Sequence, residues 1–219
     1  ATTDYGDGVV IQHKGFVNSS AALEELVARF PGAQEVFVTG ESAGGVPSPL
    51  FAGLAADTLP DARVTALADS SGAYPDVAPL NAGLAALGGT AGAIPDWPET
   101  AGITTEQWSI PGLFSYAGRH RPDITMARFD FDADSVQAQF TGLVGLDASD
   151  LRALIDRNEA EIEATGVDVA GWLASGSDHT ILSSPEVYTH EIAGQRLIEW
   201  IAALVAGEAV ADVRCETCG

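Results

Sequence analysis

Short apolar runs rich in β-branched residues alternate along the chain with longer segments rich in alanine and leucine. This alternation is typical of βαβ units, in which parallel strands form a sheet covered by helices on both faces. The apolar runs predict five strands, at residues 8–12, 35–39, 63–68, 123–129 and 167–174. We therefore expect an α/β fold built on a mostly parallel sheet.

Helical patterns lie between these predicted strands. The first helix is expected to begin at the N-cap side chains of Asn18-Ser19-Ser20 and to end near Pro31. Further helices are predicted at 47–59, 135–144, 149–165 and 185–206. The segment 75–115 is rich in proline, glycine and tryptophan and has weak periodicity, so we expect a lid or pocket wall over the strand ends.

The length and composition are those of a chain that buries a core: 219 residues, 46% of them apolar, with a mean hydropathy of +0.13. One domain over residues 1–219 is the expectation at this length. The net charge of −21 repels phosphate backbones and anionic headgroups, so no nucleic-acid partner is expected. The apolar stretch near 197–206 is too short for a membrane span and contains Glu199.

The two ends of the chain carry further signals. The chain begins with Ala1 and its single methionine is Met126, so we expect that an upstream segment was removed from a secreted or periplasmic bacterial protein. Cys215 and Cys218 form a C-x-x-C pair beside the C-terminus. Redox chemistry needs that motif at the start of a helix inside a βαβ unit, so a structural disulfide, or pairing with a cysteine outside the chain, is the preferred interpretation.

The segment Gly40-Glu41-Ser42-Ala43-Gly44 matches G-x-S-x-G, with a predicted strand before it and a helical segment after it. A tight strand-to-helix turn leaves no room for side chains at Gly40 and Gly44. Such a turn exposes Ser42 Oγ and puts the Ala43 N–H at the positive end of the next helix, where it can stabilise an oxyanion. An ordinary glycine-rich turn is the alternative interpretation.

A serine nucleophile requires a histidine base and a carboxylate that orients it. Among the four histidines, His179 alone lies in a loop just after a predicted strand, and it follows Ser42 in the order found in α/β hydrolases. We interpret His13, His120 and His190 as surface or helix-capping residues.

The acid is chosen from Asp130, Asp132 and Asp134, which follow the fourth predicted strand. Two-residue alternation places all three on one face if the strand continues that far. Asp130 is preferred on position because it is nearest the strand end, whereas Asp134 starts a helix. Asp178 is expected to shape its loop, because neighbouring side chains in an extended segment point apart.

These residues resemble the pectin acetylesterase and Notum family of serine ester hydrolases. The similar segments span most of the chain: 4–8, 11–18, 38–45, 60–64, 68–72, 134–137 and 177–180. The resemblance implies an α/β-hydrolase-like fold with Ser42 as nucleophile, His179 as base and Asp134, in place of Asp130, as acid. Family members carry upstream strands with an oxyanion segment that this chain lacks, so N-terminal strands and a second oxyanion donor are expected to be missing.

The resemblance also implies a reaction, the hydrolysis of an acetyl ester on polysaccharide or of another acyl ester, without a cofactor or a metal. Glu41, Gly44, Ser70 and Trp97 are the expected pocket residues, with Trp108 and Phe114 beside Trp97 as an aromatic wall. Two alternatives stay open. One is a type B-like carboxylesterase or lipase for small esters, because G-E-S-A-G-G also occurs there; the other is a non-catalytic hydrolase-like binding domain.

Overall fold

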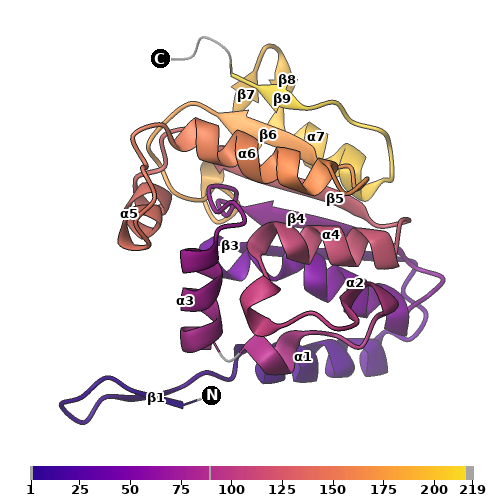
Figure 1. The fold of residues 1–219 in the computed structure, drawn as a ribbon. Helices are drawn as coiled ribbons and strands as arrows, with labels where there is room; N and C mark the ends of the chain where they lie inside the picture. Colours follow the sequence, from indigo (N-terminus) through magenta and orange to yellow (C-terminus); the bar gives the residue numbers. More distant parts are fainter. Residues whose placement is uncertain (1, 89, 216–219) are drawn as a thin grey trace.

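The computed structural model of the protein describes residues 2–88 and 90–215 (Figure 1). Its centre is a five-stranded sheet in which every neighbouring pair of strands is parallel. The strand order is β3 (Glu35–Glu41), β4 (Arg63–Asp69), β5 (Thr125–Phe131), β6 (Ala170–Ala174) and β9 (Val213–Arg214). The expectation of an α/β fold with a parallel sheet flanked by helices is confirmed.

The order of the strands in space is their order along the chain, so all their carboxyl ends lie at one edge of the sheet. The register shows this alignment, with pairs Glu41 to Asp69, Asp69 to Phe129, and Phe131 to Ala174. The loops that follow β3, β4, β5 and β6 are therefore neighbours. Open parallel sheets place their ligands at this edge.

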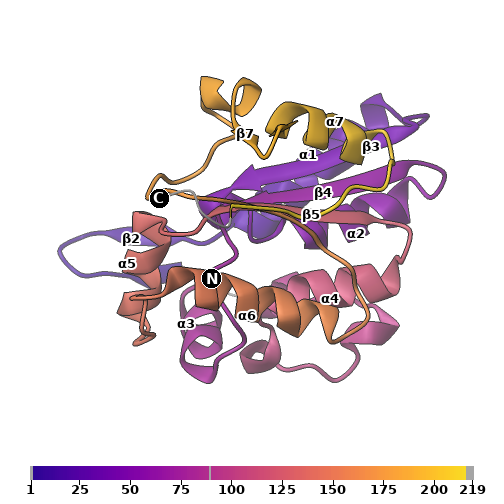
Figure 2. The same cartoon turned by 90° about the horizontal axis from the view of Figure 1, so that it is seen from above.

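Two layers of helices cover the sheet (Figure 2). One face packs against α2 (Ser48–Thr58), α4 (Ile110–His120) and α6 (Leu151–Glu163), and the other packs against α7 (Leu197–Val205). Successive side chains of β4 point to opposite faces of the sheet, so Val64 and Ala66 pack against the first helix layer and Leu67 packs against the second. The strand β4, in which every residue from Val64 to Asp69 is buried, is accordingly a near-continuous apolar run, as expected for a strand that is covered on both sides.

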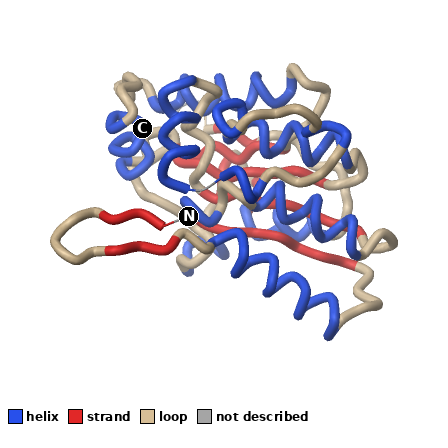
Figure 3. Tube along the Cα trace, turned by 60° about the horizontal axis from the view of Figure 1, so that its bottom comes forward, coloured by secondary structure: helices blue, strands red, loops and turns tan. Residues whose placement is uncertain are grey.

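The N-terminal segment departs from the prediction. The strand expected at 8–12 becomes β2 (Val10–Gln12), which pairs with β1 (Thr2–Asp4) in a separate antiparallel hairpin that extends away from the sheet (Figure 3). The helix α1 (Gly15–Arg29) begins before the expected N-cap and lies along the β3 edge. Its early start brings Phe16 against Phe51, with ring centroids 5.8 Å apart, a tertiary contact that outweighs local capping.

The single helix predicted over 185–206 is wrong. A 3₁₀ turn, η5 (Pro185–Tyr188), and a small hairpin of β7 (Glu191–Ile192) and β8 (Gln195–Arg196) come before α7. Both central residues of the hairpin turn have positive φ, +50° at Ala193 and +85° at Gly194, which is the backbone of a tight two-residue hairpin. His190, expected inside that helix, lies just before β7.

The segment 75–115 holds more regular structure than its composition predicts. It contains α3 (Ala78–Gly88), the 3₁₀ turns η2 (Thr90–Ala93), η3 (Pro98–Thr100) and η4 (Thr105–Gln107), and the start of α4. Phe114 is therefore part of a core helix and is buried, not part of a lid. The helix α5 (Ser135–Leu143) follows β5, close to its predicted position.

Two further findings concern the cysteine pair and the possibility of a membrane span. Cys215 is buried and takes part in a disulfide, and Cys218 lies outside the described residues. Over residues 2–88 and 90–215, no helix is both long enough and apolar enough to cross a bilayer.

Candidate active site

Ser42 lies immediately after β3 and starts a short 3₁₀ turn, η1 (Ser42–Gly44). Its φ of +54° is in the left-handed region, which serine rarely adopts, and such strain is concentrated at functional sites. The turn is tight because a Cβ at Gly40 would lie 2.2 Å from the carbonyl oxygen of Gly44. The segment thus has the backbone of a sharp elbow with serine at its bend.

The expectation that the turn leaves no room for a side chain at Gly44 is wrong. A Cβ at Gly44 would meet nothing within 4 Å, whereas a Cβ at Gly45 would lie 2.9 Å from the carbonyl oxygens of Asp69 and Gly40. The glycine after the motif therefore allows the elbow to pack on β4. Gly44 faces open space, and it lines a cavity described below.

Ala43 does not occupy the expected position at the start of a long helix. It lies inside η1, and α2 begins only at Ser48. The Gly45 and Val46 N–H groups already donate to Ser42 O at 2.9 and 3.3 Å. If the Ala43 N–H donates to an oxyanion, it therefore acts through its own dipole and not through the dipole of α2.

Asp134 and His179 are joined by a short hydrogen bond at the carboxyl edge, with 2.6 Å between Asp134 Oδ2 and His179 Nδ1. Asp134 is fully buried and is the N-cap of α5, where its Oδ1 accepts the N–H groups of Val136 and Gln137 at 2.9 and 3.0 Å. The cap fixes the carboxylate and turns Oδ2 toward the histidine loop. The structure thus brings together Asp134 and His179, the two residues for which the resemblance implied the roles of acid and base.

Neither of the two other aspartates bonds to His179. The strand β5 ends at Phe131, so the two-residue alternation stops there. Asp132 accepts the N–H of Gly176 at 3.0 Å. Asp130 lies within β5 and accepts the N–H of Gly72 at 2.9 Å. Burial raises the pKa of the Asp130 carboxyl to about 6. The condition for a shared face, a strand that continues to Asp134, is therefore not met.

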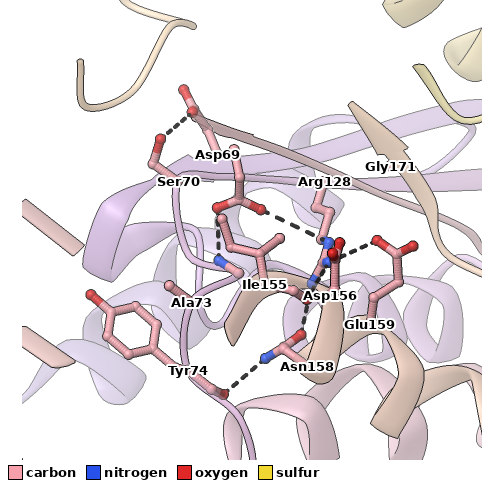
Figure 4. Close-up of polar contacts among 12 residues, drawn as sticks. Asp69, Ser70, Ala73, Tyr74, Arg128, Ile155, Asp156, Asn158, Glu159 and Gly171 are labelled. Atoms are coloured by element: carbon pink, nitrogen blue, oxygen red, sulfur yellow. Dashed lines mark hydrogen bonds and ion pairs between the residues drawn. The ribbon is translucent and has the colours of Figure 1, made fainter. Parts of the chain in front are cut away.

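Two residues at the carboxyl end of β4, Asp69 and Ser70, hold the histidine loop. Asp69 Oδ2 accepts the N–H groups of Ile181 and Leu182 at 2.8 and 2.9 Å, and Ser70 Oγ accepts that of Thr180 at 2.9 Å. Figure 4 shows Ser70 beside Asp69, to which its hydroxyl donates at 3.1 Å. Ser70 is 1% exposed, so its expected place in the pocket wall is corrected to support of the loop.

The serine elbow and the histidine loop also meet directly. Ser183 Oγ donates to Glu41 Oε2 at 3.0 Å, so Glu41 contacts the loop that carries His179. With Nδ1 of His179 donating to Asp134, the other ring nitrogen, Nε2, carries the lone pair. Within the described residues, this buried Nε2 has no hydrogen-bond partner. This nitrogen belongs to the loop after β6, at the edge of the sheet where Ser42 follows β3.

A cavity of about 600 Å³ opens beside the elbow. Ala43 and Gly44 form part of its wall, and most of its other side chains are apolar, among them Phe16, Leu50, Phe51, Trp108 and Leu113. Such a shape and lining suit an apolar group with a reactive end at the elbow. Trp108 was expected in this wall.

Trp97 is not part of the cavity wall, contrary to the prediction. It is 6% exposed and packs within the helical layer, where its ring stacks on His120 with centroids 4.4 Å apart. Its indole N–H donates to Asp57 Oδ2 at 2.9 Å. A Cβ at Gly53 would lie 2.5 Å from the Trp97 ring, so the helix α2 needs glycine at this contact.

Sequence reasoning missed a buried charged network around Arg128 (Figure 4). Arg128, 3% exposed, donates to Asn158 Oδ1 at 2.8 Å and to Glu159 Oε2 at 2.7 Å. Asn158 in turn donates to Tyr74 O at 2.8 Å. A buried arginine needs such partners, and the network ties α6 to β5 and to the loop after β4. An arginine inside an apolar strand is the one signal that would have indicated it.

Two further findings bear on the site. Over the described parts of the chain, no group of three or more His, Cys, Asp or Glu side chains is arranged to hold a metal ion. No protein-family model matches the sequence, and no curated protein matches it.

Proposed function

We propose that the protein is a serine ester hydrolase of the α/β-hydrolase type, with Ser42 as nucleophile, His179 as general base and Asp134 as the acid that orients it. The observation that carries the proposal is the 2.6 Å hydrogen bond from His179 Nδ1 to Asp134, which leaves Nε2 unpartnered at the edge where Ser42 bends out of β3. Nucleophile, base and orienting carboxylate are what acyl transfer requires.

The chemistry follows from these roles. Ser42 Oγ attacks the ester carbonyl carbon while His179 Nε2 takes the hydroxyl proton, and the Ala43 N–H donates to the oxyanion. The bond to the alcohol breaks, His179 returns the proton to the leaving alkoxide oxygen, and an acyl-enzyme remains. Water then attacks the acyl carbon while His179 takes its proton; the bond to Ser42 Oγ breaks, His179 gives the proton to Oγ, and the carboxylic acid is released.

The substrate we propose is an acyl ester, either acetylated polysaccharide or another acylated molecule. The resemblance to pectin acetylesterases and Notum supports this class, as does an apolar cavity that adjoins the elbow. A type B-like carboxylesterase has the same triad but acts on small soluble esters, and in a non-catalytic domain the serine would be inert.

A fluorophosphonate probe and a panel of esters test the proposal. We expect the probe to label the wild-type protein and Ser149→Ala, an exposed serine variant, but not Ser42→Ala. Hydrolysis of acetylated pectin, p-nitrophenyl acetate and longer p-nitrophenyl esters then identifies the substrate class. Folded wild-type protein that neither reacts with the probe nor hydrolyses any ester would be the non-catalytic alternative.

A further inference from the structure

Gln137 lies between the two buried carboxylates at the carboxyl edge of the sheet. It is 0% exposed and sits in the first turn of α5. Its Nε2 is 2.9 Å from Asp130 Oδ1 and 3.1 Å from Asp134 Oδ2, and its Oε1 is 2.9 Å from the backbone nitrogen of Ala73. A side-chain amide with all its polar contacts inside the protein is held in one place.

The chemistry of the partners fixes which way the amide points. The Ala73 N–H can only donate, so the atom facing it must be the carbonyl oxygen of Gln137. The NH₂ group therefore faces Asp130 and Asp134, and each of its two hydrogens goes to one carboxylate. The reversed amide would bring its oxygen against two carboxylates and its NH₂ against a donor.

Gln137 provides two of the four donors to Asp134. Oδ1 accepts the backbone N–H groups of Val136 and Gln137, and Oδ2 accepts His179 Nδ1 and the Gln137 side chain. The side-chain bond of Gln137 thus ends on the same oxygen that His179 uses. This bond restricts rotation of the carboxylate, and it competes with the imidazole for the negative charge on Oδ2.

We propose that Gln137 is a positioning residue for the base: its side-chain amide orients Asp134 and adjusts how strongly Oδ2 holds the His179 imidazolium. This inference rests on the proposed function of the Asp134 and His179 pair. The same amide joins the loop after β4, through Ala73, to the start of α5, and that loop also holds the histidine loop through Ser70. Gln137 acts through Asp134 and does not touch substrate.

Two substitutions at this position separate geometry from charge. Gln137→Leu removes all three side-chain hydrogen bonds at similar volume, and we expect kcat to fall about 10-fold to 100-fold with KM nearly unchanged, because the interaction concerns the transition state. Gln137→Glu keeps an acceptor for Ala73 and puts a negative charge beside Asp134. That charge favours the imidazolium, so the rising limb of kcat/KM against pH moves to higher pH.

Gln139→Leu is the matched control, an exposed glutamine on the same helix, and it is expected to keep the wild-type kcat and pH midpoint. Folded Gln137→Leu and Gln137→Glu proteins with wild-type kcat and midpoint would overturn the inference. If Gln137→Leu does not fold, the pH midpoint of Gln137→Glu decides it, because a purely structural role would leave that midpoint in place.

A readout without substrate keeps this inference separate from the proposed function. The proton between His179 Nδ1 and Asp134 Oδ2 is expected to give a low-field NMR signal, assigned by its loss in Asp134→Asn. We expect the signal to shift in Gln137→Glu and to stay in place in Gln139→Leu, whether or not any ester is hydrolysed. An unshifted signal in Gln137→Glu contradicts the role of Gln137. A shifted signal in a protein that hydrolyses no ester contradicts the proposed function alone.

Discussion

Asp134 Oδ2 lies 2.6 Å from His179 Nδ1 although 45 positions separate the two residues in the sequence. The contact exists because β5 and β6 are parallel neighbours, so the segment after one strand meets the loop after the other. Asp134 is buried and its other oxygen is held by the N-terminus of α5. The pair is thus placed by the sheet and oriented by a helix cap.

Replacing the acid tests this pair directly. We expect Asp134→Asn to lower kcat by ~10²–10⁴, because an asparagine at that position favours the wrong imidazole tautomer. Asp130→Asn should cost much less, since Asp130 bonds to Gly72 and Gln137 and not to His179. Steady-state kinetics with a p-nitrophenyl ester measure both, and the opposite order of effects would refute the assignment.

The two glycines of the elbow motif should respond differently to the same change. Gly40→Ala places a Cβ 2.2 Å from the Gly44 carbonyl oxygen, so we expect the turn to distort and labelling of Ser42 by a fluorophosphonate to be lost. Gly44→Ala meets nothing within 4 Å and is expected to fold and to be labelled. Equal labelling of the two variants would show that the elbow is not constrained as described.

Asp69 is expected to be required for the histidine loop. Asp69→Ala removes the acceptor of the Ile181 and Leu182 N–H groups, and hydrogen bonds to a charged group each contribute about 1.5–3 kcal/mol. Urea unfolding should show a loss of about 3 kcal/mol in the free energy of unfolding, together with a lower kcat. Asp61→Ala, at an exposed turn, is the control. A folded Asp69→Ala protein with wild-type kcat would speak against this role.

The buried Asp130 carboxyl predicts a pH dependence of stability. Burial raises its pKa from 3.8 to about 6, so the folded protein binds this proton more tightly than the unfolded chain does. The contribution of Asp130 to the free energy of unfolding therefore falls as pH rises from about 4 to above 6, by about 3 kcal/mol. Asp130→Asn does not titrate. Its stability relative to the wild type should rise by that amount over this range, and a pH-independent difference would contradict the prediction.

The two tryptophans assigned to the same wall should separate in kinetics. Trp97→Phe removes the hydrogen bond to Asp57 and is expected to destabilise the fold by about 1 kcal/mol while KM for a long acyl ester stays unchanged. Trp108→Phe shrinks the apolar wall of the cavity. Burial of one methylene group contributes about 0.8 kcal/mol, so the loss of that much apolar area should raise KM about fourfold. An increase in KM for Trp97→Phe would show that Trp97 lines the substrate pocket.

Patterns confined to a few neighbouring residues predicted the local structure correctly. The strands at β3, β4 and β5 follow from apolar runs, and the bend at Ser42 follows from a short motif whose geometry is local. The N-terminal hairpin and the split of segment 185–206 were missed. Two-residue turns and contacts such as Phe16 with Phe51 outweigh the local capping and periodicity signals on which such predictions rest.

The sequence alone determined the class of fold, the positions of Ser42 and His179 after two strands, and the set of aspartates from which an acid had to come. The pattern of residues by itself could not select among them, because the choice depends on the residue at which β5 stops, and Asp134 was named only through the family resemblance. Only the tertiary structure decided that Asp134 faces His179, that Asp130 is buried against Gln137, and that Trp97 packs in the core. The physical reason is that these outcomes depend on burial and on hydrogen bonds between segments far apart in the chain, which no local pattern encodes.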